Sequence, residues 1–289
     1  MEPFTIKQFN EQYTTDDACL DAIFTNRYGT LRRCSHCDKR TRFYRVKRRK
    51  CYACQSCGYQ LHPLADTIFH KSDTPLKSWF YAIYLFANSK NGVSAKELER
   101  QLGVTYKTAW RIAKQIRLLC KQVNYPLSKT VEMDDTYIGG IRPGKRGRGA
   151  AGKSIVLGAV QRQGRIAASV VSNLSAETVR PFIEQHVKHG TALMTDEFTT
   201  YRRTRKGYVH RAINHSLGKY VRGNVHTNTI EGFWSQLKRS LSGTYHAVSP
   251  KYLQSYVNEF AYRYSKRDWP ISLFFPMISR AVRPVGLAS

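Results

Sequence analysis

The sequence predicts an α/β protein in which a mixed sheet with flanking helices follows a zinc ribbon and a helix-turn-helix domain. Three observations support this prediction: two C-x2-C cysteine pairs near the N-terminus, a helical apolar pattern from Leu76, and apolar strand patterns from Thr130. Three strands, a helix and a fourth strand indicate a sheet with a helix packed over it. The predicted divisions are an N-terminal segment with the ribbon (1–70), the helix-turn-helix domain (71–125), the α/β domain (126–270) and a C-terminal tail (271–289).

The charge of the chain points to a polyanionic partner. Its 289 residues include 47 Lys and Arg against 20 Asp and Glu, a formal net charge of +27. Such charge repels itself in a compact protein, and each contact with a phosphate releases condensed counterions. A cationic membrane-binding protein is the alternative, but the sequence shows no basic amphipathic helix or lipidation motif. We therefore expect nucleic acid as the partner.

Membrane insertion and secretion are not expected. The longest apolar run, Trp79–Ala87, has nine residues, whereas a membrane span needs roughly 20. Residues 1–30 show no basic segment followed by an apolar stretch, so no signal peptide is predicted. The sequence predicts a cytoplasmic, nucleoid-associated protein with no membrane partner.

Four cysteines have the spacing of a structural zinc site. Cys34–Cys37 and Cys54–Cys57 form two C-x2-C pairs with 16 residues between them. Such pairs place four thiolates tetrahedrally around one Zn²⁺. Structural disulfides are the alternative, and they fit poorly with a cytosolic chain. Four residues could compete as ligands although the cysteine set is already complete: Cys51, His36, His62 and His70.

Two short helices follow a longer one. The apolar stripe from Leu76 predicts a helix that ends at Asn91-Gly92, and Ser94 with Glu97 predicts a capping box that opens a short helix. Gly103 lies in the tight turn before a basic helix. This arrangement is typical of a helix-turn-helix, whose second helix enters the major groove of DNA; an ordinary helical hairpin is the alternative. The predicted DNA contacts on this helix are Lys107, Arg111 and Lys114.

Acidic residues mark two of the predicted strands. Strands are predicted over 130–140, 154–160, 165–171 and 192–195, with a helix from residue 175 before the last of them. Asp134 and Asp135 lie in the first strand, and strand alternation sends them to opposite faces. Asp196 and Glu197 follow the last strand. At these two ambiguous positions we favour Asp134 and Asp196.

A third acidic residue lies on a predicted helix. Within residues 228–239, an apolar stripe at helical spacing leaves Asn228, Glu231 and Lys238 together on the polar face. Phosphoryl transfer on a nucleic-acid backbone uses divalent ions held by oxygen ligands, which suits Mg²⁺ or Mn²⁺. Carboxylates from a strand, a neighbouring strand end and a helix form such a cage; a solvated polar helix face is the alternative.

These residues carry a resemblance to one family. Asp134, Asp196 and Glu231 leave 61 and 34 residues between them, and Lys238 follows seven residues after the glutamate. This spacing resembles the DDE triad of bacterial insertion-sequence transposases with an N-terminal zinc ribbon and a ribonuclease H-like catalytic domain. The resemblance spans 15–268 and is most specific in the blocks 131–140 and 226–239. Because some relatives carry Asn at the third position, Asn228 is a ligand candidate beside or instead of Glu231.

The resemblance implies a DNA transposase acting by a two-metal mechanism. Its N-terminal domains would bind terminal inverted repeats, its C-terminal domain would cleave and join strands with Mg²⁺ or Mn²⁺, and Lys238 would contact a phosphate. The implied partners are double-stranded DNA, both element ends and target, and further copies of the chain on DNA. Candidate DNA contacts outside the helix-turn-helix are Lys145, Arg146 and Arg148, His226, and Arg239. A solvated hairpin tip is the alternative for the first three, and a capping or packing role is the alternative for His226.

Two other functions stay open at this point. One is a DNA-binding regulator, built from the ribbon and the helix-turn-helix, whose nuclease domain is degenerate. The other is a ribonuclease H-like nuclease that cuts DNA without joining it. The presence of all three acidic residues counts against the regulator.

Overall fold

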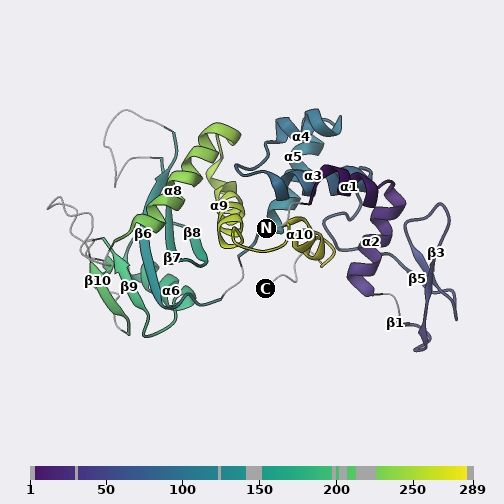
Figure 1. Cartoon of the computed structure of the whole chain (residues 1–289), viewed down its shortest axis with the longest axis horizontal. Helices are drawn as coiled ribbons and strands as arrows, with labels where there is room; N and C mark the ends of the chain where they lie inside the picture. The colour runs from purple at the N-terminus through teal and green to yellow at the C-terminus, as the bar shows by residue number, and fades with distance from the viewer. Residues whose placement is uncertain are drawn as a thin grey trace. The chain divides into compact units, whose positions relative to one another are not determined.

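The computed structural model of the chain describes residues 4–29, 32–122, 125–140, 152–196, 200–201, 207–212 and 226–284. The backbone divides into two compact units, Met1–Leu119 with Trp269–Ser289, and Cys120–Asp268. Figure 1 shows the elements of both. Among the helices of these described ranges, none is both long and apolar enough to cross a membrane.

The first unit begins with two helices and the ribbon. Helices α1 (Ile6–Gln12) and α2 (Asp16–Tyr28) start at threonine caps, since Thr5 and Thr15 accept bonds from backbone N–H groups of the first turn. Strands β1 (Arg32–Arg33) and β2 (Arg40–Thr41) form one hairpin. A three-stranded antiparallel sheet follows, made of β3 (Phe43–Arg45), β4 (Tyr52–Cys54) and β5 (Gln60–Leu61).

The helices predicted after the ribbon are present. They are α3 (Leu76–Asn88), α4 (Ala95–Leu102) and α5 (Tyr106–Leu118). Ser94 accepts the N–H of Glu97 at the start of α4, and Gly103 ends that helix with φ 63°, a left-handed conformation that glycine adopts without strain. On α5 the apolar residues at helical spacing are buried: Ala109, Ile112, Ala113 and Ile116.

The C-terminal segment differs from the prediction of a tail. Helix α10 (Phe274–Ala281) forms there, and it packs against α3. Phe274 is fully buried and stacks on Phe4, with ring centroids 5.0 Å apart. Its apolar residues at positions 274, 277, 278 and 281 recur at helical spacing, which explains why the segment belongs to the first unit.

The second unit contains a five-stranded mixed sheet. The strands are β6 (Thr130–Ile138), β7 (Ser154–Gln161), β8 (Ile166–Val171), β9 (Ala192–Thr195) and β10 (Val209–Ala212), in the spatial order β10-β9-β6-β7-β8. Strands β6, β7 and β8 are antiparallel, whereas β9 runs parallel to β6 and β10 parallel to β9. The mixed α/β prediction is confirmed, and β10 is a strand that it did not include.

Helices cover both faces of this sheet (Figure 1). On one face, α6 (Ala176–His186) packs through Val179, Phe182 and Ile183 against β6, β7 and β9. On the other, α8 (Asn228–Ser240) and α9 (Pro250–Ser265) pack against β7 and β8. A short π-helical turn, η2 (Leu241–Tyr245), follows α8 directly. Helix α8, which carries Glu231, is therefore held on the sheet beside the acidic strand β6.

Side chains satisfy the outer edge of β8. The Ala168 N–H donates to Gln122 Oε1 (2.9 Å), and Gln122 Nε2 donates to the carbonyl of Ala168 (2.8 Å). The Val170 N–H donates to Gln254 Oε1 (2.7 Å), and the Ile166 N–H donates to Ser265 Oγ (3.1 Å). Every second backbone N–H group of β8 faces away from β7, and each of these groups therefore has a side-chain partner.

Candidate functional site

The four predicted zinc ligands converge. The sulfur atoms of Cys34, Cys37, Cys54 and Cys57 all lie within 4.8 Å of one another. Cys34 and Cys57 are 3.8 Å apart at Sγ, and Cys37 and Cys54 are 3.9 Å apart. Tetrahedral Zn–S bonds of about 2.3 Å separate sulfur atoms by about 3.8 Å. All seven cysteines are free thiols, so the disulfide alternative is not realised.

The two halves of this site have the same backbone geometry. The N–H of Cys34 donates to the carbonyl of Lys39, and the N–H of Cys54 donates to that of Tyr59. In each half the residue after the second cysteine, Asp38 or Gly58, takes a positive φ, 58° and 73°. Each C-x2-C pair is therefore a tight turn that directs both thiols to one point. Of the competing ligands, Cys51 donates to Gln60 Oε1 instead.

The strand β6 presents its two aspartates to opposite faces of the sheet. Asp134 lies on the α8 face, where its Oδ2 accepts the indole N–H of Trp234 (3.2 Å). Asp135 accepts the hydroxyl of Tyr201 (2.9 Å), a fully buried ring in the core cluster of the α6 face. The two carboxylates differ in their partners: Asp135 accepts the hydroxyl of a buried tyrosine on the α6 face, and Asp134 accepts the indole N–H of a residue of α8.

Asp196 comes level with Asp134 because β9 pairs with β6. Glu132 is opposite Met194 in this parallel pair, and Asp134 and Asp196 each lie two residues further along. The pKa of Asp134 is raised to about 7, first by burial and then by the negative charge of Asp135, with further contributions from Asp196 and Glu231. Asp196 and Glu231, from a strand end and a helix, therefore both act electrostatically on Asp134.

Helix α8 exposes the polar face that was predicted. Asn228, Glu231 and Lys238 are all exposed, and Glu231 Oε1 accepts the hydroxyl of Thr227 (2.7 Å). Lys238 lines a groove of about 440 Å³ together with Gly139 and Gly140 at the end of β6. The lysine thus borders the space between the acidic strand and the helix.

The three carboxylates are spaced more widely than the cysteine ligands. In the ranges that the structure describes, the four cysteines are the one group of three or more His, Cys, Asp or Glu residues whose donor atoms all lie within 4.8 Å. Asp134 and Glu231 are each held by a hydrogen bond to a neighbour, Trp234 and Thr227 respectively. The described carboxylates therefore do not form a closed single-ion cage like that of the four cysteines.

The candidate DNA contacts fall into two groups. Lys107, Arg111 and Lys114 are exposed on α5, whereas the next basic residue, Arg117, is buried. Arg239 is exposed on α8 and His226 is half-buried just before it. The remaining candidates, Lys145, Arg146 and Arg148, lie outside the described residues. The alternative acid Glu197 also lies outside them.

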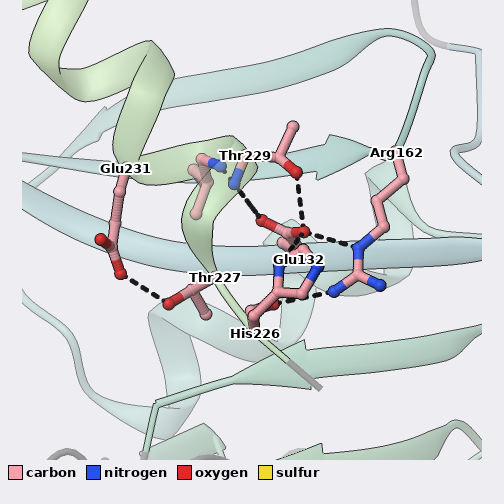
Figure 2. A network of polar contacts seen from close by, with 7 residues as sticks. Glu132, Arg162, His226, Thr227, Thr229 and Glu231 are labelled. Atoms are coloured by element: carbon pink, nitrogen blue, oxygen red, sulfur yellow. Dashed lines mark hydrogen bonds and ion pairs between the residues drawn. The ribbon is translucent and has the colours of Figure 1, made fainter. Parts of the chain in front are cut away.

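Sequence reasoning missed two features beside this site. Glu132, two residues before Asp134, is fully buried and bonded to the start of α8 (Figure 2). Gly158, opposite Asp134 on β7, lies directly under the ring of Trp234. A glutamate between two apolar residues of one strand, Val131 and Met133, and a glycine inside another strand are the signals that could have indicated them.

The chain combines a four-cysteine ribbon with a mixed α/β domain that carries acidic residues on adjacent elements, and comparison with known families assigns both parts. Residues 126–265 match the ISXO2-like transposase domain, and residues 14–60 match the transposase zinc-ribbon domain. The chain thus carries both domains of these insertion-sequence transposases, which confirms the resemblance and supports the zinc prediction. Its family contains DNA-processing enzymes.

Individual relatives agree with this assignment. A Halobacterium salinarum protein described as an uncharacterized protein in transposable element ISH50 is 26% identical over 238 residues, 76% of this chain and 79% of that protein. An uncharacterized transposase-like protein of Haemophilus influenzae is 27% identical over 100 residues, 34% of this chain and 80% of the relative. Among solved structures, a chain of the simian T-cell lymphotropic virus intasome in complex with PP2A regulatory subunit B56 gamma is similar over 65% of this chain and 64% of that chain, with 11% sequence identity. The TM-score of this comparison is 0.28, which is too low to establish a shared fold.

Proposed function

We propose that this transposase binds the terminal inverted repeats of an insertion sequence and catalyses metal-dependent DNA cleavage followed by strand transfer. The observation that supports this most is the electrostatic interaction of Asp134 with Asp196 and Glu231, which come from a strand, a strand end and a helix. In a chain of net charge +27 that is proposed to bind DNA, such a cluster of negative charge has a use when a cation neutralises it.

The order of the elements supports the finer assignment of the two domains. Three antiparallel strands, a helix and two further strands parallel to the first support a ribonuclease H-like fold for the catalytic domain. Helix α4, the turn at Gly103 and the basic helix α5 support a helix-turn-helix. Lys107, Arg111 and Lys114 would then contact DNA from the exposed side of α5.

The donor set suits Mg²⁺ or Mn²⁺. Carboxylate and amide oxygens are the ligands these cations prefer. The pKa of Asp134 is raised first by burial and then by neighbouring carboxylates, and a bound cation would offset both effects. When bound, the cations would stabilise negative charge on the phosphate oxygens. Asp134, Asp196 and Glu231 would hold them, and Asn228 offers an amide oxygen beside or in place of Glu231.

The proposed reaction has two steps. Water attacks the phosphodiester at the element end, the bond from phosphorus to the 3′ oxygen breaks, and a 3′-hydroxyl is left. That hydroxyl then attacks a phosphodiester of the target, forming one phosphorus–oxygen bond as another breaks. Lys238, two helical turns beyond Glu231, would contact a phosphate, and His226 and Arg239 would add contacts at the two ends of α8. Further copies of the chain would bring both element ends together.

A strand-transfer assay with Mg²⁺ and labelled element ends tests this proposal. Asp134→Asn should abolish cleavage while end binding persists. Asp135→Asn is the matched control, because it removes the same charge from the neighbouring residue while its amide oxygen still accepts the Tyr201 hydroxyl. Glu231→Gln compared with Asn228→Ala identifies the third ligand.

Each outcome has a defined meaning. Full cleavage by the Asp134→Asn variant refutes the catalytic assignment. Cleavage without joining by the wild-type protein identifies a nuclease, and end binding without any cleavage identifies a regulator. The size of the protein–DNA complex in solution tests assembly of several chains on DNA.

A further inference from the structure

Glu132 is a buried carboxylate with an unusually complete set of donors. Its side chain is fully buried in the middle of β6. Oε1 accepts bonds from Arg162 Nε (2.6 Å) and the Thr229 hydroxyl (2.8 Å), and Oε2 accepts the N–H groups of Thr229 (2.8 Å) and Ile230 (3.1 Å). Figure 2 shows these contacts meeting at the carboxylate. Both oxygens are therefore used within the protein.

Two of these donors belong to the first turn of α8. The N–H groups of a first turn have no partner inside the helix, and a negative charge placed there is favoured by the helix dipole. Within the described structure, the residue at the cap position, Thr227, makes no side-chain capping bond; its hydroxyl donates to Glu231 instead. The cap of α8 is thus supplied by a strand residue almost a hundred positions earlier.

The Glu132–Arg162 pair also holds the segment that leads into α8. Arg162, the residue after β7, pairs with Glu132 and also donates through Nη2 to the carbonyl of His226 (3.0 Å). The Nδ1 atom of His226 lies 3.2 Å from Glu132 Oε1, without hydrogen-bond geometry. The ion pair with Arg162 balances the buried charge, and full burial keeps Glu132 away from substrate and cations.

Glu132 and Asp134 fix α8 on either side of Glu231. The two acids share one face of β6; Glu132 holds residues 229 and 230, and Asp134 holds Trp234. We infer that Glu132 is a positioning residue: it locks the first turn of α8 onto β6 so that Glu231 stays beside Asp134. This inference rests on the proposed function, in which both acids bind cations.

The variant Glu132→Gln tests the inference because an amide cannot replace this carboxylate. All partners of both oxygens are donors, so in either orientation the NH₂ group of glutamine faces other donors. Glu259→Gln is the matched control: Glu259 is equally buried in the same unit and is paired with Arg263 (2.8 Å) and Tyr245, but it lies on α9. Both variants are measured at a temperature at which thermal unfolding shows them folded.

Two readouts separate positioning from general destabilisation. Hydrogen exchange of the peptide spanning 228–235 should accelerate in Glu132→Gln and remain at the wild-type rate in Glu259→Gln. At saturating DNA, cleavage by Glu132→Gln should slow by about 10–100-fold, as for other residues that orient metal ligands. Its affinity for element ends should remain unchanged, and Glu259→Gln should cleave at the wild-type rate.

The opposing results are distinct. Wild-type exchange and cleavage in Glu132→Gln overturn the inference, and so do equal losses in both variants. A wild-type protein that never cleaves refutes the proposed function, while the exchange measurement still decides whether Glu132 holds α8. If Glu132→Gln does not fold, two variants of Thr229 replace it: Thr229→Val removes the hydroxyl that donates to Glu132, and Thr229→Ser retains it. Faster hydrogen exchange of the peptide 228–235 in the valine variant alone supports the inference. Equal exchange rates in the two variants overturn it.

Discussion

The absence of a side chain at Gly158 lets the ring of Trp234 approach the sheet beside Asp134. A Cβ atom at position 158 would be 2.6 Å from Cη2 and 2.7 Å from Cζ2 of Trp234, and 3.3 Å from Cδ1 of Ile230. Carbon atoms in contact are normally separated by roughly 3.5–4.0 Å, so Gly158→Ala forces the indole to move by about 1 Å. The indole N–H would then leave Oδ2 of Asp134, which it now reaches at 3.2 Å.

The expected cost is that of an overpacked core. Gly158→Ala should lower the free energy of unfolding by about 1–3 kcal/mol. Each kcal/mol should lower the unfolding midpoint by about 2–4 °C in a unit of this size. Cleavage should also slow, because Asp134 loses the donor that orients it. Gly140→Ala is the control, since nothing lies within 4 Å of a Cβ at that position.

A double-mutant cycle with Trp234→Phe identifies the cause. The smaller ring leaves room for the alanine methyl group, so Gly158→Ala should cost less in this background, with a coupling of about 0.5–3 kcal/mol. Cleavage should not recover, because phenylalanine has no N–H to donate to Asp134. Additive losses of stability, or an unchanged midpoint in Gly158→Ala, would refute the steric reasoning.

Three further predictions concern other parts of the chain. Metal analysis should find about one zinc per chain, and chelation should expose the thiols of Cys34 and Cys37 and unfold the ribbon; a metal-free folded ribbon would contradict this. Gly232→Ala, in the exposed middle of α8 with nothing within 4 Å, should raise the free energy of unfolding by about 0.5–1 kcal/mol, measured by denaturant titration. Lys107→Ala should reduce the salt dependence of end binding, measured as a slope of log K against log salt, by about 1; an unchanged slope would remove Lys107 from the interface.

Local patterns predicted most of the elements. Predicted strands and helices over 130–140, 154–160, 165–171, 192–195 and 228–239 correspond to β6, β7, β8, β9 and α8, because the spacing of buried side chains depends only on neighbours along the chain. The cysteine spacing predicted the ribbon for the same reason. Strand β10 was missed since its residues are mostly exposed and show no apolar alternation.

Long-range partners could not be predicted in the same way. Nothing near Glu132 in the sequence indicates that its carboxylate caps a helix starting at residue 228. Likewise, the hydroxyl that binds Asp135 comes from Tyr201, whose position depends on how the α6 face packs. Alternation along β6 placed Asp134 and Asp135 on opposite faces, but only the folded chain shows which face meets α8.

The side-chain bonds along β8 limit how copies of this protein can associate. Exposed strand edges recruit strands from other molecules, because their unpaired N–H and C=O groups invite further pairing. Here Gln122, Gln254 and Ser265 already occupy the outward N–H groups of that strand. Intermolecular sheet extension at β8 would first have to displace those three side chains. This edge therefore resists sheet extension between molecules at high protein concentration.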